Sequence, residues 1–324
     1  MRRRESSSPR NKTISSRHEN ESISTSRNNK NIAWMRSMEK NWLDHLKKLN
    51  LNIQNERSQS FPFLATPTTV VHLIFKICRC TNQSPDVRYL AVEIFDRFSY
   101  YHFKSLIKNV WVNNEYEECT KKWKHVMSRV KSQFLLRLLS CIQISAKFTN
   151  SQNQKLIQAM AVKKFLSKAG KVYSLRSILA SEVRVLKTID FKLHIPTISV
   201  FVDFLIEFIR CNLAEDVNQH ILHETSVNLI DIVYLHHQEI YHKLHYISTG
   251  CWERAENDRY RFLPIECNRI FLACAVIRAS INVVLPDQED IGSDISVQLD
   301  QLTDVPAGDI SALAAVIMEQ IIIT

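Results

Sequence analysis

Two charged residues, Lys147 and Glu182, lie inside segments that are otherwise apolar. Lys147 stands near the end of FLLRLLSCIQISAKF, residues 134–148. Glu182 lies in an apolar stripe, four residues after Ile178 and four before Leu186. A buried ammonium or carboxylate is costly unless a group of opposite charge pairs with it. The two residues therefore predict an ion pair between neighbouring helices.

The polar side chains of residues 134–148 form one narrow band, at spacings of three and four that place them on one side of a helix: Arg137, Ser140, Gln143 and Lys147. A helix that is apolar on its other sides lies at the centre of a bundle. The band must then face an opening in the bundle wall. Arg137 is a second candidate partner for Glu182, and an ordinary weak ion pair at the edge of a stripe explains the residues equally well.

Elsewhere the sequence has no catalytic or metal-binding pattern. Six histidines gather between residues 220 and 245, but no two have the i, i+4 spacing common in zinc sites. Cys78-x-Cys80 is not followed by a second pair of cysteines at zinc-ribbon spacing. The chain has only four glycines, too few to favour a glycine-rich phosphate-binding loop. We therefore expect a non-enzymatic protein without metal or cofactor, which acts through protein contacts.

The composition favours an all-α fold. The chain has 324 residues, of which 45% are hydrophobic, and only 4 glycines and 8 prolines. Because β-turns depend on glycine and proline, their scarcity favours long helices joined by short connections.

The positive charge is concentrated near the N-terminus. The formal net charge is +9, and residues 1–60 contain 13 lysines and arginines against 6 acidic residues. Residues 61–324 contain 29 against 27. A basic tail can contact nucleic acid or an acidic partner, whereas a near-neutral body predicts no direct nucleic-acid contact outside the tail.

The cysteines and the hydropathy pattern predict a soluble, intracellular protein. The chain has eight cysteines, and several, such as Cys141 and Cys274, lie in apolar helical patterns where a free thiol packs as a small hydrophobe. The polar N-terminus is unlike a secretory signal, and no charge-free apolar run is long enough to span a bilayer. We expect reduced thiols and no membrane contact.

The pattern divides the chain into three parts. Residues 1–60 form a disordered basic tail with a short amphipathic helix near 34–50, residues 61–195 an N-terminal helical domain, and residues 196–324 a C-terminal one. The apolar periodicity predicts five helices in each domain: 67–80, 85 to a polar link at 108–124, 126–148, 154–168 and 174–191 in the first, and 197–211, 216–247, 265–284, 295–302 and 308–322 in the second.

Three stretches resemble helices of the cyclin box. YLAVEIFDRF (89–98) is similar to its second helix, SCIQISAKF (140–148) to its third, and ASEVRVLKTIDFKLHIPT (180–197) to its fifth. The resemblance implies an all-α fold of two tandem five-helix cyclin-type bundles. In cyclins, the lysine and the glutamate at these places contact the partner kinase. The resemblance therefore implies that Lys147 and Glu182 are kinase-binding residues.

Within this family, residues 67–324 resemble the cyclin-like proteins of meiotic crossing-over. The similarity rests on residues 134–148, on LIDIVYLHHQEIY (229–241), on the long link before the third helix with Trp123 in it, and on the final helix. It implies a non-catalytic regulator in the nucleus, on meiotic chromosomes. Its partners would be a cyclin-dependent kinase and crossover proteins.

Two departures from ordinary cyclins keep alternatives open. Thr149 and Asn150 stand where an ordinary cyclin usually has two glutamates, which weakens the expectation of stable kinase activation. VVHLIFKI (70–77) replaces the Met-Arg-x-x-Leu helix, so recruitment of substrates through Arg-x-Leu motifs is not expected. A kinase-independent scaffold and a nucleic-acid-associated module of the same fold are the alternatives.

Overall fold

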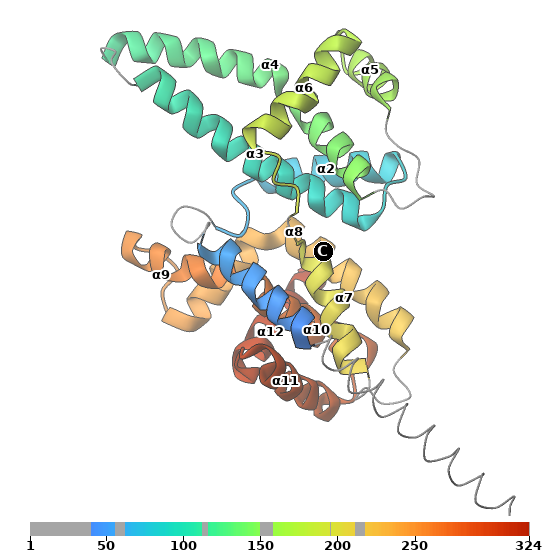
Figure 1. The fold of residues 1–324 in the computed structure, drawn as a ribbon. Coiled ribbons are helices and arrows are strands. Elements are labelled where there is room, and N and C mark those ends of the chain that lie inside the picture. The colour runs from blue at the N-terminus through green and yellow to red at the C-terminus, as the bar shows by residue number, and fades with distance from the viewer. Residues whose placement is uncertain are drawn as a thin grey trace, which may run out of the picture. The chain divides into compact units, whose positions relative to one another are not determined.

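The computed structural model describes residues 40–55, 62–111, 116–149, 158–194, 196–210 and 218–323. Within these ranges every regular element is a helix and none is a strand (Figure 1), which confirms the all-α prediction. The chain divides into two units, residues 1–49 and 50–324. A helix covers residues 40–55, while the predicted disordered tail and the start of the helix predicted near 34–50 lie outside the described residues.

The first bundle is built around the second half of one helix, α4. Every residue from Leu138 to Ala146 is buried, which confirms the prediction of a central helix. The other four helices pack against α4. The five are α2 (Thr68–Cys80), α3 (Pro85–Trp111), α4 (Tyr116–Phe148), α5 (Ala159–Lys168) and α6 (Leu175–Thr188).

The polar link predicted at 108–124 is wrong. Helix α3 continues to Trp111 and α4 already begins at Tyr116, so most of the supposed link is helical. The two helices pack along each other as a hairpin (Figure 1), and the Cys119 thiol closes it 3.2 Å from the carbonyl oxygen of Val110. Lysine and glutamate are good helix formers. A hairpin with wide solvent-facing sides has no continuous apolar stripe that would reveal it in the sequence.

Three predicted helix boundaries are confirmed. Helix α3 begins at Pro85, after Ser84 and with Asp86 in its first turn, where proline and an acidic residue are favoured. The Ser174 hydroxyl caps α6 by accepting the amide proton of Ser177 at 3.1 Å. Gly170, just after α5, has φ +70°, a left-handed conformation that glycine adopts without steric cost.

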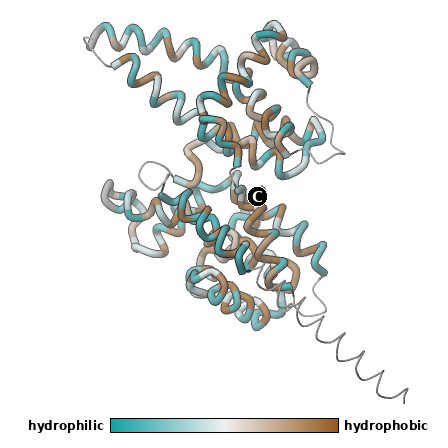
Figure 2. The backbone as a smooth tube through the Cα atoms, in the orientation of Figure 1, coloured by the Kyte–Doolittle hydropathy of each residue, from teal (hydrophilic) through white to brown (hydrophobic). Residues whose placement is uncertain are grey.

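A second bundle follows, with α10 at its centre. Every residue of α10 from Arg269 to Ile281 is buried, and α7, α8, α11 and α12 pack against it. Figure 2 shows hydrophobic residues concentrated where these helices meet. The helices are α7 (Ile198–Ile209), α8 (Gln219–Thr249), α9 (Glu256–Glu266), α10 (Arg269–Val284), α11 (Glu289–Thr303) and α12 (Ala307–Ile323).

Helix α9 was not predicted, and the helix predicted at 265–284 begins later, at Arg269. The sequence of α9 is polar and contains Pro264, so it resembles a linker. The structure buries Phe262 and Leu263 and ends α9 at Cys267, whose amide bonds to the Leu263 carbonyl oxygen. Asn268 then caps α10.

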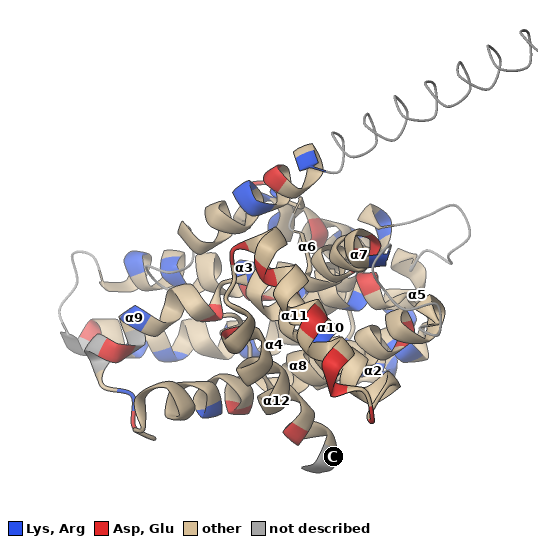
Figure 3. Cartoon of the chain, turned by 90° about the horizontal axis from the view of Figure 1, so that it is seen from below, with Lys and Arg blue, Asp and Glu red and all other residues tan. Residues whose placement is uncertain are grey.

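The predicted boundary between the two domains, at 195/196, falls in the connection between α6 and α7 and stays a prediction. Lysines and arginines are interspersed with acidic residues over most helices (Figure 3). In the described ranges no single helix is long and apolar enough to cross a membrane. The bent pair Tyr260–Glu266 and Arg269–Val284 meets that length and composition only when taken together.

Candidate functional site

Lys147 and Glu182 form the predicted ion pair. They lie on α4 and α6, which pack against each other (Figure 1). The Lys147 ammonium donates to both carboxylate oxygens, at 2.7 Å to Oε1 and 2.8 Å to Oε2. The Glu182 side chain is only 9% exposed, whereas that of Lys147 is 49% exposed. The pairing is therefore confirmed, and the kinase-binding role of the two residues stays a prediction.

Helix α6 buries part of the stripe that the sequence indicated, together with a second polar residue, Ser181. Its buried residues are Ile178, Ser181, Glu182 and Val185. Leu186 of the predicted stripe is only partly buried, and Leu179, the residue after Ile178, is 49% exposed. The buried face therefore has Ser181 and Glu182 at its middle, and both polar groups lie against α4.

A second set of polar contacts fixes how α6 lies on α4. Arg137, the alternative partner for Glu182, donates instead to the Ser181 hydroxyl at 2.7 Å and to Gln133 Oε1 at 2.9 Å. The hydroxyls of Ser140 and Ser181 lie 2.7 Å apart. These contacts join the same two helices as the ion pair and stabilise the register in which Glu182 lies opposite Lys147. The sequence signal for Ser181 is a small polar residue next to the acidic one in a buried face.

Exposed apolar side chains surround the ion pair. Leu179 and Val183 of α6 are 49% and 47% exposed, and Phe148, directly after Lys147, is 43% exposed. An ammonium has three protons to donate, and Glu182 accepts two hydrogen bonds from Lys147, so one donor remains for another molecule. We call Lys147, Phe148, Leu179, Glu182 and Val183 the α4–α6 surface. Polar groups fixed among apolar ones are typical of protein-binding surfaces.

Helix α4 ends directly after this surface. The amide and the hydroxyl of Thr149 both donate to the Ser145 carbonyl oxygen, each at 2.9 Å. Thr149 thus completes the helix end and provides no carboxylate next to Lys147. Asn150, the second departure noted in the sequence, lies outside the described residues.

The expectations of no metal and no cofactor stay predictions. Within the part of the chain that the structure describes, no three His, Cys, Asp or Glu side chains are placed to hold a metal ion. His237 and His245, from the histidine-rich region, are buried and bond to backbone carbonyl oxygens.

Comparison with known proteins shows which proteins the chain is similar to. Residues 44–194 match the family model "Cyclin, N-terminal domain". The chain is 26% identical over 283 residues to Cyclin N-terminal domain-containing protein 1 of Mus musculus, which covers 86% of this chain and 82% of that protein. The Homo sapiens protein of the same name is 26% identical over 275 residues, covering 85% and 81%. The chain is thus a cyclin-fold protein related to Cyclin N-terminal domain-containing protein 1, and its residues 44–194 match the cyclin N-terminal domain.

Proposed function

We propose that the chain is a non-catalytic, cyclin-like regulator that binds a cyclin-dependent kinase through the α4–α6 surface. The observation that supports this most directly is the ion pair of Lys147 with the nearly buried Glu182. It lies on the two helices where, by the resemblance to cyclins, a lysine and a glutamate contact the kinase. The match of residues 44–194 to the cyclin N-terminal domain supports the same proposal.

In this proposal the ion pair is a preorganised polar contact site for the kinase. The serine contacts hold α6 in register on α4, so the two charges do not have to be ordered when the kinase arrives. The kinase covers the exposed Leu179 and Val183 and accepts the remaining hydrogen bond of Lys147. Burying a charged pair at an interface fixes register and suppresses wrong partners more than it increases affinity.

We extend the proposal to meiotic recombination. The resemblance of residues 134–148 and 229–241 to the cyclin-like proteins of meiotic crossing-over supports a role in crossover designation or maturation, in the nucleus and on meiotic chromosomes. Crossover-site proteins would then be its further partners. The two relatives match 86% and 85% of this chain, so the similarity extends into the second bundle.

The direct test measures binding of the purified chain to a panel of purified cyclin-dependent kinases. Lys147→Ala and Glu182→Ala each leave one charge of the pair unpartnered and should cost about 2–5 kcal/mol of kinase binding. Lys122→Ala is a matched control, because Lys122 forms an exposed ion pair with Glu118 on the outer part of α4. Binding that is unchanged in both test variants, with all proteins folded by circular dichroism, would rule out the docking role.

A kinase-independent scaffold is the second candidate, because Thr149 completes the end of α4 and provides no carboxylate there. Affinity purification from meiotic cells separates the two candidates. A regulator should lose the kinase in the Lys147→Ala/Glu182→Ala double variant. A scaffold should recover the same crossover proteins from both forms of the chain, without a kinase in either.

A further inference from the structure

Helix α6 also borders a second opening, between itself and the hairpin of α3 and α4. This cavity has a volume of about 590 Å³. Three basic residues line it, one from each helix: His102, Arg129 and Arg184. Hydrogen-bonding side chains from α3 and α4 also face it, among them Ser105, Asn109 and Gln133. We call this cavity the cationic pocket.

The positive charges at the cationic pocket lack compensation. Neither Arg129 nor Arg184 forms an ion pair with any described residue, and no carboxylate is among the residues that line the pocket. Arg137 lies within electrostatic reach. The pKa of His102 is lowered first by burial and then by Arg137 and Arg184, and the pKa of Arg137 is lowered by burial and then by Arg184. Like charges held this close repel one another until an anion comes between them.

We propose that the cationic pocket binds the phosphate group of a phosphoserine or phosphothreonine peptide from a partner protein. Two guanidinium groups from different helices suit a phosphate, because each presents paired N–H donors to its oxygens. The neighbouring sequence adds a favourable field: residues 97–131 contain eight lysines and arginines against three glutamates. The near-zero balance of residues 61–324 as a whole conceals this local excess.

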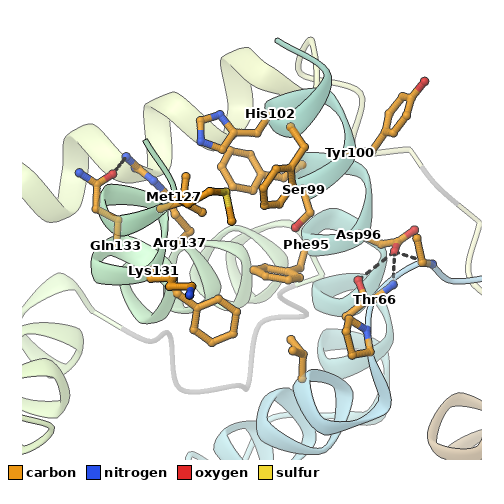
Figure 4. Close-up of a pocket in the computed structure, with 17 residues that line it drawn as sticks. Thr66, Phe95, Asp96, Ser99, Tyr100, His102, Met127, Lys131, Gln133 and Arg137 are labelled. Atoms are coloured by element: carbon orange, nitrogen blue, oxygen red, sulfur yellow. Dashed lines mark hydrogen bonds between the residues drawn. The ribbon is translucent and has the colours of Figure 1, made fainter. Parts of the chain in front are cut away.

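An apolar pocket next to the cationic one favours a peptide over nucleic acid. Its volume is about 620 Å³, and it shares His102, Val130 and Gln133 with the cationic pocket. Its lining is mainly aliphatic and aromatic and includes Pro67, Val70, Phe95, Phe98, Met127 and Phe134. In Figure 4, Gln133 and Arg137 lie on one side of this pocket and Asp96 on the other, where the backbone amide and hydroxyl of Thr66 bind its carboxylate.

The two adjoining pockets fit a phosphorylated residue followed or preceded closely by a large apolar side chain. A DNA duplex presents repeated phosphates, and its bases are paired and stacked, so it has no large apolar group that could fill the adjoining pocket. Neither Lys147 nor Glu182 lines either pocket, so this inference does not depend on kinase binding at the α4–α6 surface.

The test uses the full chain and an oriented library of fluorescent peptides with one fixed phosphoserine or phosphothreonine and varied apolar neighbours. The same library with unphosphorylated serine and threonine is the reference. We expect the best phosphopeptide to bind at least about tenfold more tightly than its unphosphorylated form, as a charge-assisted site requires. Inorganic phosphate should compete with it, and chloride at equal ionic strength should not.

Two double variants locate the binding site. Arg129→Gln/Arg184→Gln should weaken phosphopeptide binding about tenfold or more, because it removes both guanidinium groups. Lys121→Gln/Lys124→Gln changes the net charge equally on an exposed part of α4 that does not line the pocket, and should weaken binding less than about threefold. Both arginines are exposed, so the variants should fold, which thermal melting verifies.

Three results would overturn the proposal. The first is equal affinity for phosphorylated and unphosphorylated peptides. The second is an equal loss of affinity in the two double variants, which would mean diffuse charge attraction. The third is tighter binding of a 20-base-pair DNA duplex than of any phosphopeptide, with DNA binding weakened selectively by Arg129→Gln/Arg184→Gln. That result would make the pocket part of a nucleic-acid site.

Discussion

The thiols of the chain differ in exposure and in the cost of ionisation. Cys80 and Cys251 are exposed, whereas Cys78, Cys141 and Cys274 are buried. Burial raises the pKa of Cys78 and of Cys274 to about 12, and raises that of Cys141 further. Since the thiolate is the reactive form, and almost none of these three thiols is ionised at neutral pH, they should react very slowly.

We therefore expect selective alkylation in the native protein. Iodoacetamide at pH 8 should modify Cys80 and Cys251 within minutes and leave Cys78, Cys141 and Cys274 unmodified until denaturant is added. Peptide mapping by mass spectrometry measures each position separately. Modification of Cys141 at the rate of Cys80 would contradict the burial of the centre of α4.

The ion pair was predictable at this scale, but its surroundings were not. A lysine and a glutamate within buried helical patterns each need a partner, so the sequence predicted a pair of Lys147 with Glu182 and left Arg137 as the alternative partner. The contact of Arg137 with Ser181 could not be predicted, because it depends on how α6 is rotated against α4. The cationic pocket also escaped prediction, because it depends on how α3, α4 and α6 pack, and Asn109 in its wall lies in the supposed polar link.

At the scale of helices, the predictions succeeded where burial imposed a pattern. Helix α4 is buried on all sides from Leu138 to Ala146, and its apolar run identified it as central. Helix α10 is buried from Arg269 to Ile281, and its apolar run predicted a helix there. The outer part of the α3–α4 hairpin and the whole of α9 were missed. They are held by a few contacts, such as Cys119 with Val110, and most of their surface faces solvent. Apolar periodicity arises from the burial of one helix face, so it does not reveal helices that bury few residues.

Helix α8 contains a histidine whose protonation should weaken the fold. The helix bends at His236, and the next residue, His237, is buried with its Nδ1 3.0 Å from the Tyr234 carbonyl oxygen. Burial lowers the pKa of His237, although the bond to Tyr234 and the charges of Asp96 and Glu239 partly oppose this. The folded chain thus holds His237 neutral, whereas the unfolded chain binds a proton near the ordinary value of 6.5.

The free energy of unfolding should therefore decrease as the pH falls below about 6.5, by at most about 1.4 kcal/mol per pH unit from this group. His237→Phe removes the titrating group and places another ring beside Phe63, whose ring centre lies 6.2 Å from that of His237. Urea unfolding between pH 7.5 and pH 5 compares the two proteins. Identical pH dependence in the wild type and the variant would show that His237 does not contribute.

At the scale of the 50–324 unit, buried charges join the two bundles. Arg269 of α10 donates to Glu93 of α3 at 2.7 Å and to the Pro196 carbonyl oxygen at 3.0 Å, and the side chains of the ion pair are 1% and 0% exposed. The Tyr234 hydroxyl donates to the other oxygen of Glu93 at 3.2 Å. Nearby, Arg88 and Asp231 also pair between the bundles. The sequence did not predict these pairs, because Arg269 and Glu93 are 176 positions apart.

The Arg269–Glu93 pair should determine whether the bundles unfold together. Arg269→Met leaves the Glu93 carboxylate buried without its cation and should cost about 3–5 kcal/mol of stability, measured by urea unfolding. The double variant Arg269→Met/Glu93→Leu removes both charges, so it should be more stable than Arg269→Met alone, and a double-mutant cycle gives the coupling energy. Lys122→Ala, at an exposed pair, should cost less than about 1 kcal/mol. If Arg269→Met costs no more than Lys122→Ala, or the two core substitutions are simply additive, apolar packing alone holds the bundles together.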